Sequence, residues 1–216
     1  DLGEAVLAEA RWPELSASRA NFAAADLTSA DLRRGIFGAV KAQEASFEGA
    51  DLSGALFMEG DATGAVFTKA VLADAVLTRV KLAAAEFGQA VLERVELHDV
   101  DLTAASWEGV TASGIRIAGG RLDGLRAPAA LLEGLHLSRA SAKGAIFEDS
   151  VVYGAVVAFV ALDDADFTGC ILETASFDSC TMKSARFAGA NLASARLLRC
   201  DCFEASFEAA RLVSCE

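Results

Sequence analysis

Two histidines and five cysteines are the residues of this chain whose types best suit catalysis or metal binding. The histidines, His98 and His136, each stand alone in the sequence. A zinc site usually includes a C-x2-C pair, and none occurs among the cysteines, which are Cys170, Cys180, Cys200, Cys202 and Cys215. We therefore expect no metal site, no cofactor and no catalytic residue among them.

An acidic cluster and a glycine-rich segment each allow two interpretations. Asp163, Asp164 and Asp166 could bind a hard cation such as Ca²⁺, or they could be solvated surface residues. The segment GIRIAGGRLDG, residues 114–124, has the glycines of a phosphate loop. Such a loop needs a strand before it and a helix after it, and no helical periodicity occurs here. We interpret these glycines as tight turns and predict that the chain is not an enzyme.

The elements that must position these residues follow from a period of five. The chain divides into pentads such as ANFAA and ADLTS from Ala20, and ASFDS and CTMKS from Ala175. We call the large apolar residue of each pentad its centre. A centre falls at every residue number that ends in 2 or 7, and every centre is apolar. The residue two places before the centre is small, most often Ala. A repeat that never slips indicates a solenoid.

The pattern Ala-(Asp/Asn/Ser)-(Leu/Phe)-x-x resembles that of the pentapeptide-repeat family over the whole chain. The resemblance implies an all-β fold, a right-handed quadrilateral parallel β-helix with one pentad per side and about 20 residues per coil. It also implies that the centre and the small residue point inward while the other three point outward. We expect residues 1–216 to form a single domain of about eleven coils.

Sorting the centres at intervals of one coil supports this geometry. One side is mostly Phe, as in Phe47, Phe67 and Phe87, and the next is mostly Leu. Four of the cysteines occupy the small inward position and the fifth is a centre, so we expect buried, reduced thiols and a cytoplasmic location. Both histidines should point outward, nearly two coils apart. The residues that stack on the acidic cluster, Gly144 and Ser184, add no ligand, which favours a solvated corner.

Composition limits the partners of the chain. The net charge of −12 argues against direct binding to nucleic acid. The uncharged run SVVYGAVVAFVAL, residues 150–162, is shorter than the roughly 20 residues of a membrane span, so we expect no membrane insertion.

Both ends fall within a repeat and neither has a capping helix. We therefore expect a segment of a longer protein, or ends that partners cover.

The outward charges of one side alternate in sign from coil to coil. The residues before the centres read Lys41, Asp61, Lys81, Asp101 and Arg121. Those after the centres read Asp123, Lys143, Asp163 and Lys183. Opposite charges on adjacent strands stabilise their pairing. We predict that this side satisfies its own charges and fixes the coil register.

The uncharged run contributes to an apolar stripe on the outside of the rod. The stripe follows the outward position before the centre and reads Val71, Val91, Thr111, Leu131, Val151 and Ile171. The adjacent side adds Ile36, Leu56, Val76 and Val156, and beside the stripe Glu93, Glu133 and Glu173 alternate with Ser113 and Tyr153. Contiguous exposed apolar residues usually mark an interface. The alternative is that β-branched residues merely suit a flat sheet.

Two functions follow from these observations. The first is a non-enzymatic interaction or scaffold module that binds a protein partner or an adjacent domain through the stripe, with a homodimer as one form. The resemblance places such modules in larger bacterial proteins, including accessory proteins of type VI secretion. The alternative is a DNA mimic that binds DNA gyrase or topoisomerase, as quinolone-resistance members of the family do. Its negative charge has the right sign, but opposite charges would neutralise much of it.

Overall fold

Tight turns at every fifth residue set the architecture. The Ala50 N–H donates to the Phe47 carbonyl oxygen at 3.0 Å. This bond closes a β-turn whose third residue, Gly49, has a φ of 63°. All residues whose numbers end in 4 or 9 share a positive φ, the feature that type II turns require. On one side of each coil the turn bond is missing, and there three consecutive residues stay extended and form a strand.

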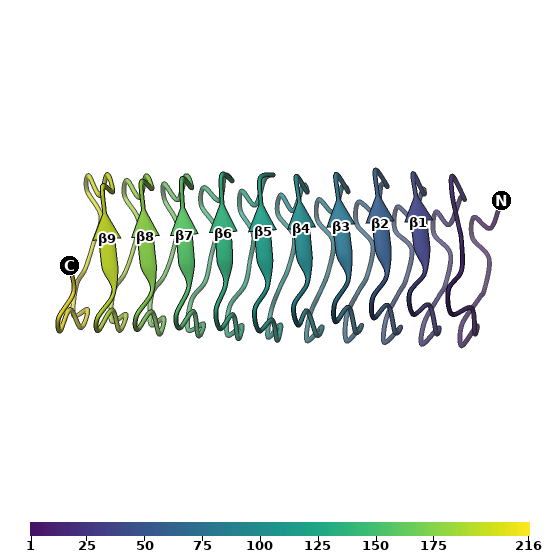
Figure 1. Ribbon diagram of the computed structural model, residues 1–216, viewed down its shortest axis with the longest axis horizontal. Helices are drawn as coiled ribbons and strands as arrows, with labels where there is room; N and C mark the ends of the chain where they lie inside the picture. Colours follow the sequence, from purple (N-terminus) through teal and green to yellow (C-terminus); the bar gives the residue numbers. More distant parts are fainter.

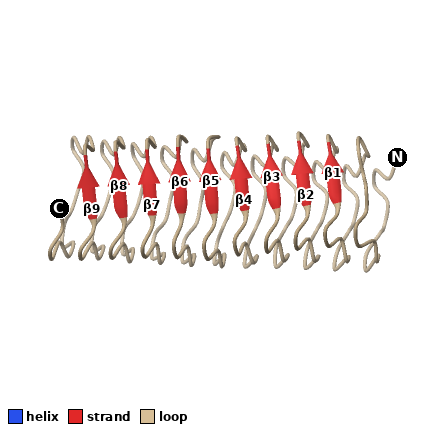
Figure 2. Ribbon diagram, in the orientation of Figure 1, coloured by secondary structure: helices blue, strands red, loops and turns tan.

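Nine short strands form one parallel sheet along the rod, and the computed structural model, which describes residues 1–216, contains no helix (Figures 1 and 2). The strands are β1 (Ile36–Gly38), β2 (Leu56–Met58), β3 (Val76–Thr78), β4 (Glu96–His98), β5 (Arg116–Ala118), β6 (His136–Ser138), β7 (Val156–Ala158), β8 (Ser176–Asp178) and β9 (Arg196–Leu198). They are ordered from β1 to β9, with the two chain termini at opposite ends of the rod (Figure 1).

The coil repeat is 20 residues, as the sequence predicts. Ile36 pairs with Leu56, and Leu56 pairs with Val76. The other three sides are joined by isolated parallel bridges in the same register, such as Val71 with Val91. The prediction of an all-β parallel solenoid is confirmed. The predicted count of about eleven coils is too high for the regular sheet, which makes about eight turns. The first coil pairs with the next only through isolated bridges, such as Val6 with Asp26 and Ser16 with Ile36.

The core is a single column of stacked centres. Every centre from Ala17 to Leu192 is buried, which confirms the predicted inward register. The rings of Phe47 and Phe67 stack with centroids 4.9 Å apart, and those of Phe67 and Phe87 stack at 4.8 Å. The Phe87 ring meets Trp107 edge-on, at 72°. Stacking at the strand spacing lets each ring cover its neighbour, so one coil supports the next.

The one polar residue among the small inward sites is accommodated by a specific pair of hydrogen bonds. Ser150 is fully buried. Its hydroxyl accepts a hydrogen bond from the Ala130 N–H at 2.9 Å and donates to the Ala127 carbonyl oxygen at 2.5 Å. The hydroxyl therefore bridges the turn of the preceding coil, and the buried polar group is satisfied.

Candidate functional site

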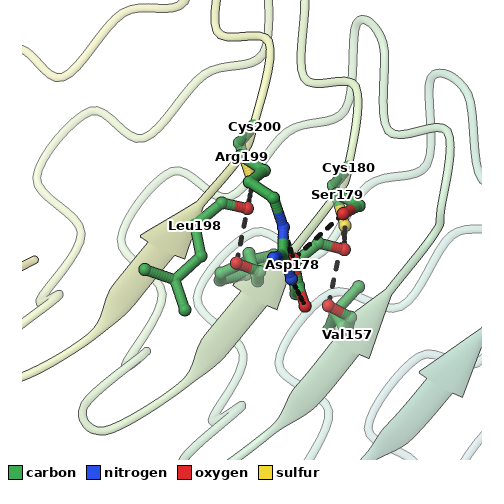
Figure 3. A network of polar contacts seen from close by, with 8 residues as sticks. Val157, Asp178, Ser179, Cys180, Leu198, Arg199 and Cys200 are labelled. Atoms are coloured by element: carbon green, nitrogen blue, oxygen red, sulfur yellow. Dashed lines mark hydrogen bonds and ion pairs between the residues drawn. The ribbon is translucent and has the colours of Figure 1, made fainter.

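The cysteines are free thiols held in the core or at its margin. Cys170 and Cys180 are buried, and Cys200, Cys202 and Cys215 are partly buried. Burial raises the pKa of Cys170 to about 12 and that of Cys180 to about 11. The Cys180 Sγ donates to the Val157 carbonyl oxygen at 3.6 Å, and the Cys200 Sγ to that of Leu198 at 3.4 Å (Figure 3). The buried pair stays protonated at neutral pH. The prediction of buried thiols is confirmed for these two and is wrong for Cys200, Cys202 and Cys215, which are only partly buried.

The other chemistry-bearing residues lie apart on the surface. His98 lies on β4 and His136 on β6, with β5 between them. His98 Nε2 is 3.5 Å from a carboxylate oxygen of Glu96, and His136 Nδ1 is 2.9 Å from the carbonyl oxygen of Gly134. A groove at one corner is lined by polar and charged residues and has no hydrophobic side chain. No group of three or more His, Cys, Asp or Glu side chains could hold a metal ion.

The carboxylates of the acidic cluster point to different partners. Asp163 is 3.5 Å from the Lys143 ammonium, one coil before it. Asp166 is buried and lies 2.6 Å from the Arg186 guanidinium, one coil after it. Partial burial raises the pKa of Asp166, but hydrogen bonds from Arg186 and Thr168 outweigh it and hold the pKa below its ordinary value. Each of these two carboxylates pairs with a cation on an adjacent coil, which favours a structural role over metal binding. The expected solvated position is wrong for Asp166, which is buried.

We call the side on which charges alternate from coil to coil the paired face. Some of the predicted ion pairs form on it and others do not. Lys81 and Asp61 lie 3.5 Å apart, and Lys183 and Asp201 lie 3.3 Å apart. Asp101 departs from the prediction. It stacks between Lys81 and Arg121, yet its carboxylate accepts hydrogen bonds from the Thr103 N–H and hydroxyl, at 3.0 and 2.6 Å. Asp61 accepts the same hydrogen bonds from Thr63 and still pairs with Lys81, so the local bonds do not explain why Asp101 lacks an ion pair.

Ion pairs between coils also cover the corners of the rod. Asp74 and Arg94 pair at 2.6 Å, and Glu59 and Arg79 pair at 2.5 Å. At the end of β8, the Asp178 carboxylate pairs with Arg199 and accepts the Ser179 hydroxyl at 3.0 Å (Figure 3). Hydrogen bonding to Arg199 and Ser179 lowers the pKa of Asp178. Much of the acidic charge is therefore neutralised within the rod.

The predicted stripe forms a continuous row, which we call the strip. Its members pair in sequence along one side, namely Val71, Val91, Thr111, Leu131, Val151 and Ile171. The first five are half-buried, because stacked neighbours cover their flanks, and Ile171 is 40% exposed. The strip lies on the side opposite the paired face, since two pentads separate the two sides in each coil. Its apolar side chains stand outside the core.

The residues after the centres on this side form a second row beside the strip. We call Glu93, Glu133 and Glu173 the glutamate row; Ser113 and Tyr153 alternate with them. A carboxylate oxygen of Glu93 is 3.5 Å from Arg94, and Glu173 accepts a hydrogen bond from Asn191 at 2.5 Å. Glu133 is exposed and has no ion-pair partner, and Tyr153 is 47% exposed. No Lys or Arg occupies either row between Val71 and Ala193.

The adjacent side carries two separate apolar groups instead of one stripe. Ile36, Leu56 and Val76 are paired neighbours on β1, β2 and β3. Val156 lies on β7, where His136 and Ser176 pair with it. Ile36 is 42% and Val156 is 43% exposed. Val76 and Val156 share their coils with Val71 and Val151 of the strip, whereas Ile36 and Leu56 share theirs with Asp31 and Asp51.

Sequence reasoning missed two exposed aromatic residues, Phe159 and Phe203, which is 64% exposed. Phe159 is 59% exposed and occupies the turn position with a φ of 58°. The residues one coil before and after it are Arg139 and Ser179. A bulky side chain in this backbone region is an outlier. The available signal was that no other turn position of the chain holds an aromatic residue.

Comparison with known proteins identifies the family. The model of pentapeptide repeats matches residues 1–38, 36–72, 70–106 and 162–199, with eight copies. The chain belongs to the pentapeptide-repeat family. No curated protein matches this pentapeptide-repeat protein. No helix of the structure has the length and apolar character needed to cross a membrane.

Two solved structures are similar to the chain. The chain is similar to HetL, a pentapeptide repeat protein involved in heterocyst differentiation regulation from the cyanobacterium Nostoc sp. strain PCC 7120, with 24% identity over 94% of this chain and 87% of HetL, and a TM-score of 0.42. It is also similar to QnrB1, a plasmid-mediated fluoroquinolone resistance protein, with 20% identity over 87% of this chain and 91% of QnrB1, and a TM-score of 0.46.

Proposed function

We propose that this pentapeptide-repeat protein is a non-enzymatic scaffold that binds a protein partner, or an adjacent domain of the same polypeptide, through the strip and the glutamate row. The observation that carries the proposal is the continuous row of outward residues from Val71 to Ile171, which is apolar except at Thr111. Burying such residues stabilises a complex by about 25 cal/mol per Å². Tyr153, Val156 and the group of Ile36, Leu56 and Val76 extend the same surface.

The surrounding charges support this choice of surface. On the paired face, cations and carboxylates pair with each other, as Asp61 does with Lys81. Beside the strip, Glu93 lies 3.5 Å from Arg94, and neither row contains a cation that could pair with Glu133. Glu133 therefore has a free carboxylate to offer a basic partner, and an acidic rim of this kind favours such a partner.

The charge pattern weighs against the alternative of a DNA mimic that binds gyrase or topoisomerase. Duplex DNA presents one negative charge per roughly 1.7 Å of its axis. On this rod, cross-coil pairs such as Asp74 with Arg94 and Asp166 with Arg186 interrupt any continuous negative surface. A role in an accessory protein of bacterial type VI secretion is one setting for the scaffold, suggested by the family resemblance.

The experiment compares two double variants of the full-length protein. Val91→Lys with Val151→Lys places two charges on the strip. Ala83→Lys with Ala161→Lys places two charges on the paired face and serves as the matched control. Size-exclusion chromatography with light scattering and affinity capture from the producing cell would measure association, and circular dichroism melts would measure folding.

We expect both double variants to fold like the wild type, because none of the four side chains is in the core. We expect the strip variant alone to lose association. Association by the strip variant equal to that of the control would contradict the proposal. A strip variant that fails to fold would contradict the outward placement of Val91 and Val151.

A further inference from the structure

The dimensions of the strip limit which partner it can bind. Five coil steps separate Val71 from Ile171. Stacked phenylalanine rings beneath the coils are 4.8 Å apart, so the strip is about 24 Å long. Its two rows are two residues apart, which is about 6.6 Å across a strand. An α-helix about 10 Å wide covers both rows, and a length of about 16 residues spans the strip.

Along one edge of the strip, three successive turn residues are glycines and have no side chain. The turn positions that follow the glutamate row in three successive coils are Gly114, Gly134 and Gly154, each with a positive φ. The space where a Cβ of Gly134 would lie is open, with no heavy atom within 4 Å. No side chain of these turns therefore rises beside Glu133. A partner lying on the strip can place long side chains over this edge.

The spacing of the glutamate row matches the heptad repeat of a helix. Glu93, Glu133 and Glu173 occur in every second coil. Two steps of 4.8 Å place successive carboxylates about 9.6 Å apart. Seven residues of an α-helix rise about 10.5 Å. The mismatch of about 1 Å per step is well within the reach of a flexible Lys or Arg side chain.

The charges of the rod disfavour a second copy of the chain as the occupant. Each copy has a net charge of −12, so two copies repel each other. The same side also continues beyond the strip into charged residues, Asp31 and Asp51 at one end and Arg211 at the other. A second rod would have to cover these residues together with the strip, whereas a helix covers the strip alone.

We infer that the strip binds an amphipathic α-helix whose basic residues recur at every seventh position and contact the glutamate row, while its apolar stripe packs on Val91, Leu131 and Val151. The inference rests on the proposed function and specifies the partner. The probe that tests it is a synthetic helical peptide of about 18 residues with a Leu and Ala stripe and Lys at positions i, i+7 and i+14. The matched peptide has Glu at the same three positions.

Fluorescence anisotropy would measure the binding of each peptide to three forms of the protein. We expect the wild type to bind the Lys peptide at least about tenfold more tightly than the Glu peptide, since three ion pairs form or are replaced by repulsion. The triple variant Glu93→Lys, Glu133→Lys and Glu173→Lys should reverse this preference. The double variant Val91→Lys with Val151→Lys should lose binding of both peptides.

The outcomes separate this inference from the proposed function. Equal binding of the two peptides by the wild type, or no reversal in the triple variant, would overturn the helix inference. If peptide binding fails while the strip variant still loses its cellular partner, the strip remains an interface and only the helical partner is wrong. A preference for the Lys peptide that survives in the strip variant would place the helix elsewhere and also overturn the inference.

Discussion

The paired face and the side that bears the strip are opposite sides of the same coils, and both have outward residues stacked at a 20-residue interval. On the paired face, Asp61 pairs with Lys81 and Asp163 with Lys143. On the strip, apolar residues stack without such pairs, and Glu133 has no cation nearby. The same backbone therefore carries one surface that satisfies itself and one that does not. The comparison suggests that function lies where the surface does not contribute to coil register.

The largest effect should come from the core that both sides share. Phe87 is 2% exposed and stacks between Phe67 and Trp107. Phe87→Ala should lower the free energy of unfolding by roughly 3–5 kcal/mol, because it removes a buried ring and leaves a cavity. Denaturant melts would measure the change. A loss below about 1 kcal/mol would show that the structure relaxes around Phe87 and that the stacked column is not the common support.

A smaller effect should come from the paired face alone. Asp61→Lys removes the pair with Lys81 and the hydrogen bonds from Thr63, and it places three cations in one row with Lys41. We expect a loss of about 1–2 kcal/mol at low salt that shrinks as salt is added. Thermal melts at two salt concentrations would test this, with Val91→Lys on the strip as the control that should change stability little. Equal losses in the two variants would remove the distinction between the sides.

These results bear on how much the sequence could predict. The inward register was predictable because every centre is apolar, and the buried column from Ala17 to Leu192 follows it. The missing ion pair of Asp101 was not predictable from spacing, because Asp61 has the same local bonds to a Thr and is likewise stacked between two cations, yet Asp61 alone pairs. The exposed Phe159 was overlooked, although the pentad places it outward, because the search for exposed apolar residues followed only the positions next to the centres.

The Asp61 carboxylate on the paired face should also make the stability of the fold depend on pH. Partial burial raises the pKa of Asp61, but hydrogen bonds from Thr63 and the charge of Lys81 outweigh it, so the folded pKa lies below the unfolded value. Stability from this carboxylate is therefore present above the unfolded pKa of about 3.9 and is lost as the pH falls through the folded pKa. Asp61→Asn should reduce the loss of stability between about pH 5 and pH 2. Melts across this range would measure it, and identical pH profiles would contradict the assignment.

The smallest expected effect concerns Phe159, which lies outside the strip. Phe159→Gly should leave stability unchanged or raise it by up to about 1 kcal/mol, because glycine adopts a φ near 58° without strain. Binding of the Lys peptide should stay the same, since a full side of the rod separates Phe159 from the strip. A weaker complex would show that the interface is wider than the strip and reaches this corner.

The most direct test of the account measures whether the strip is covered in the producing cell. Single cysteines would replace Val151 on the strip and Ala161 on the paired face, and peptide-resolved mass spectrometry would follow their reaction with a thiol reagent. Both sites should react in the purified protein, since both are partly exposed there. In the cell, the account predicts that the Val151→Cys thiol is protected while the Ala161→Cys thiol reacts as it does in the purified protein. Equal reactivity of the Val151→Cys thiol in the two settings, or protection of the paired face instead, would contradict it.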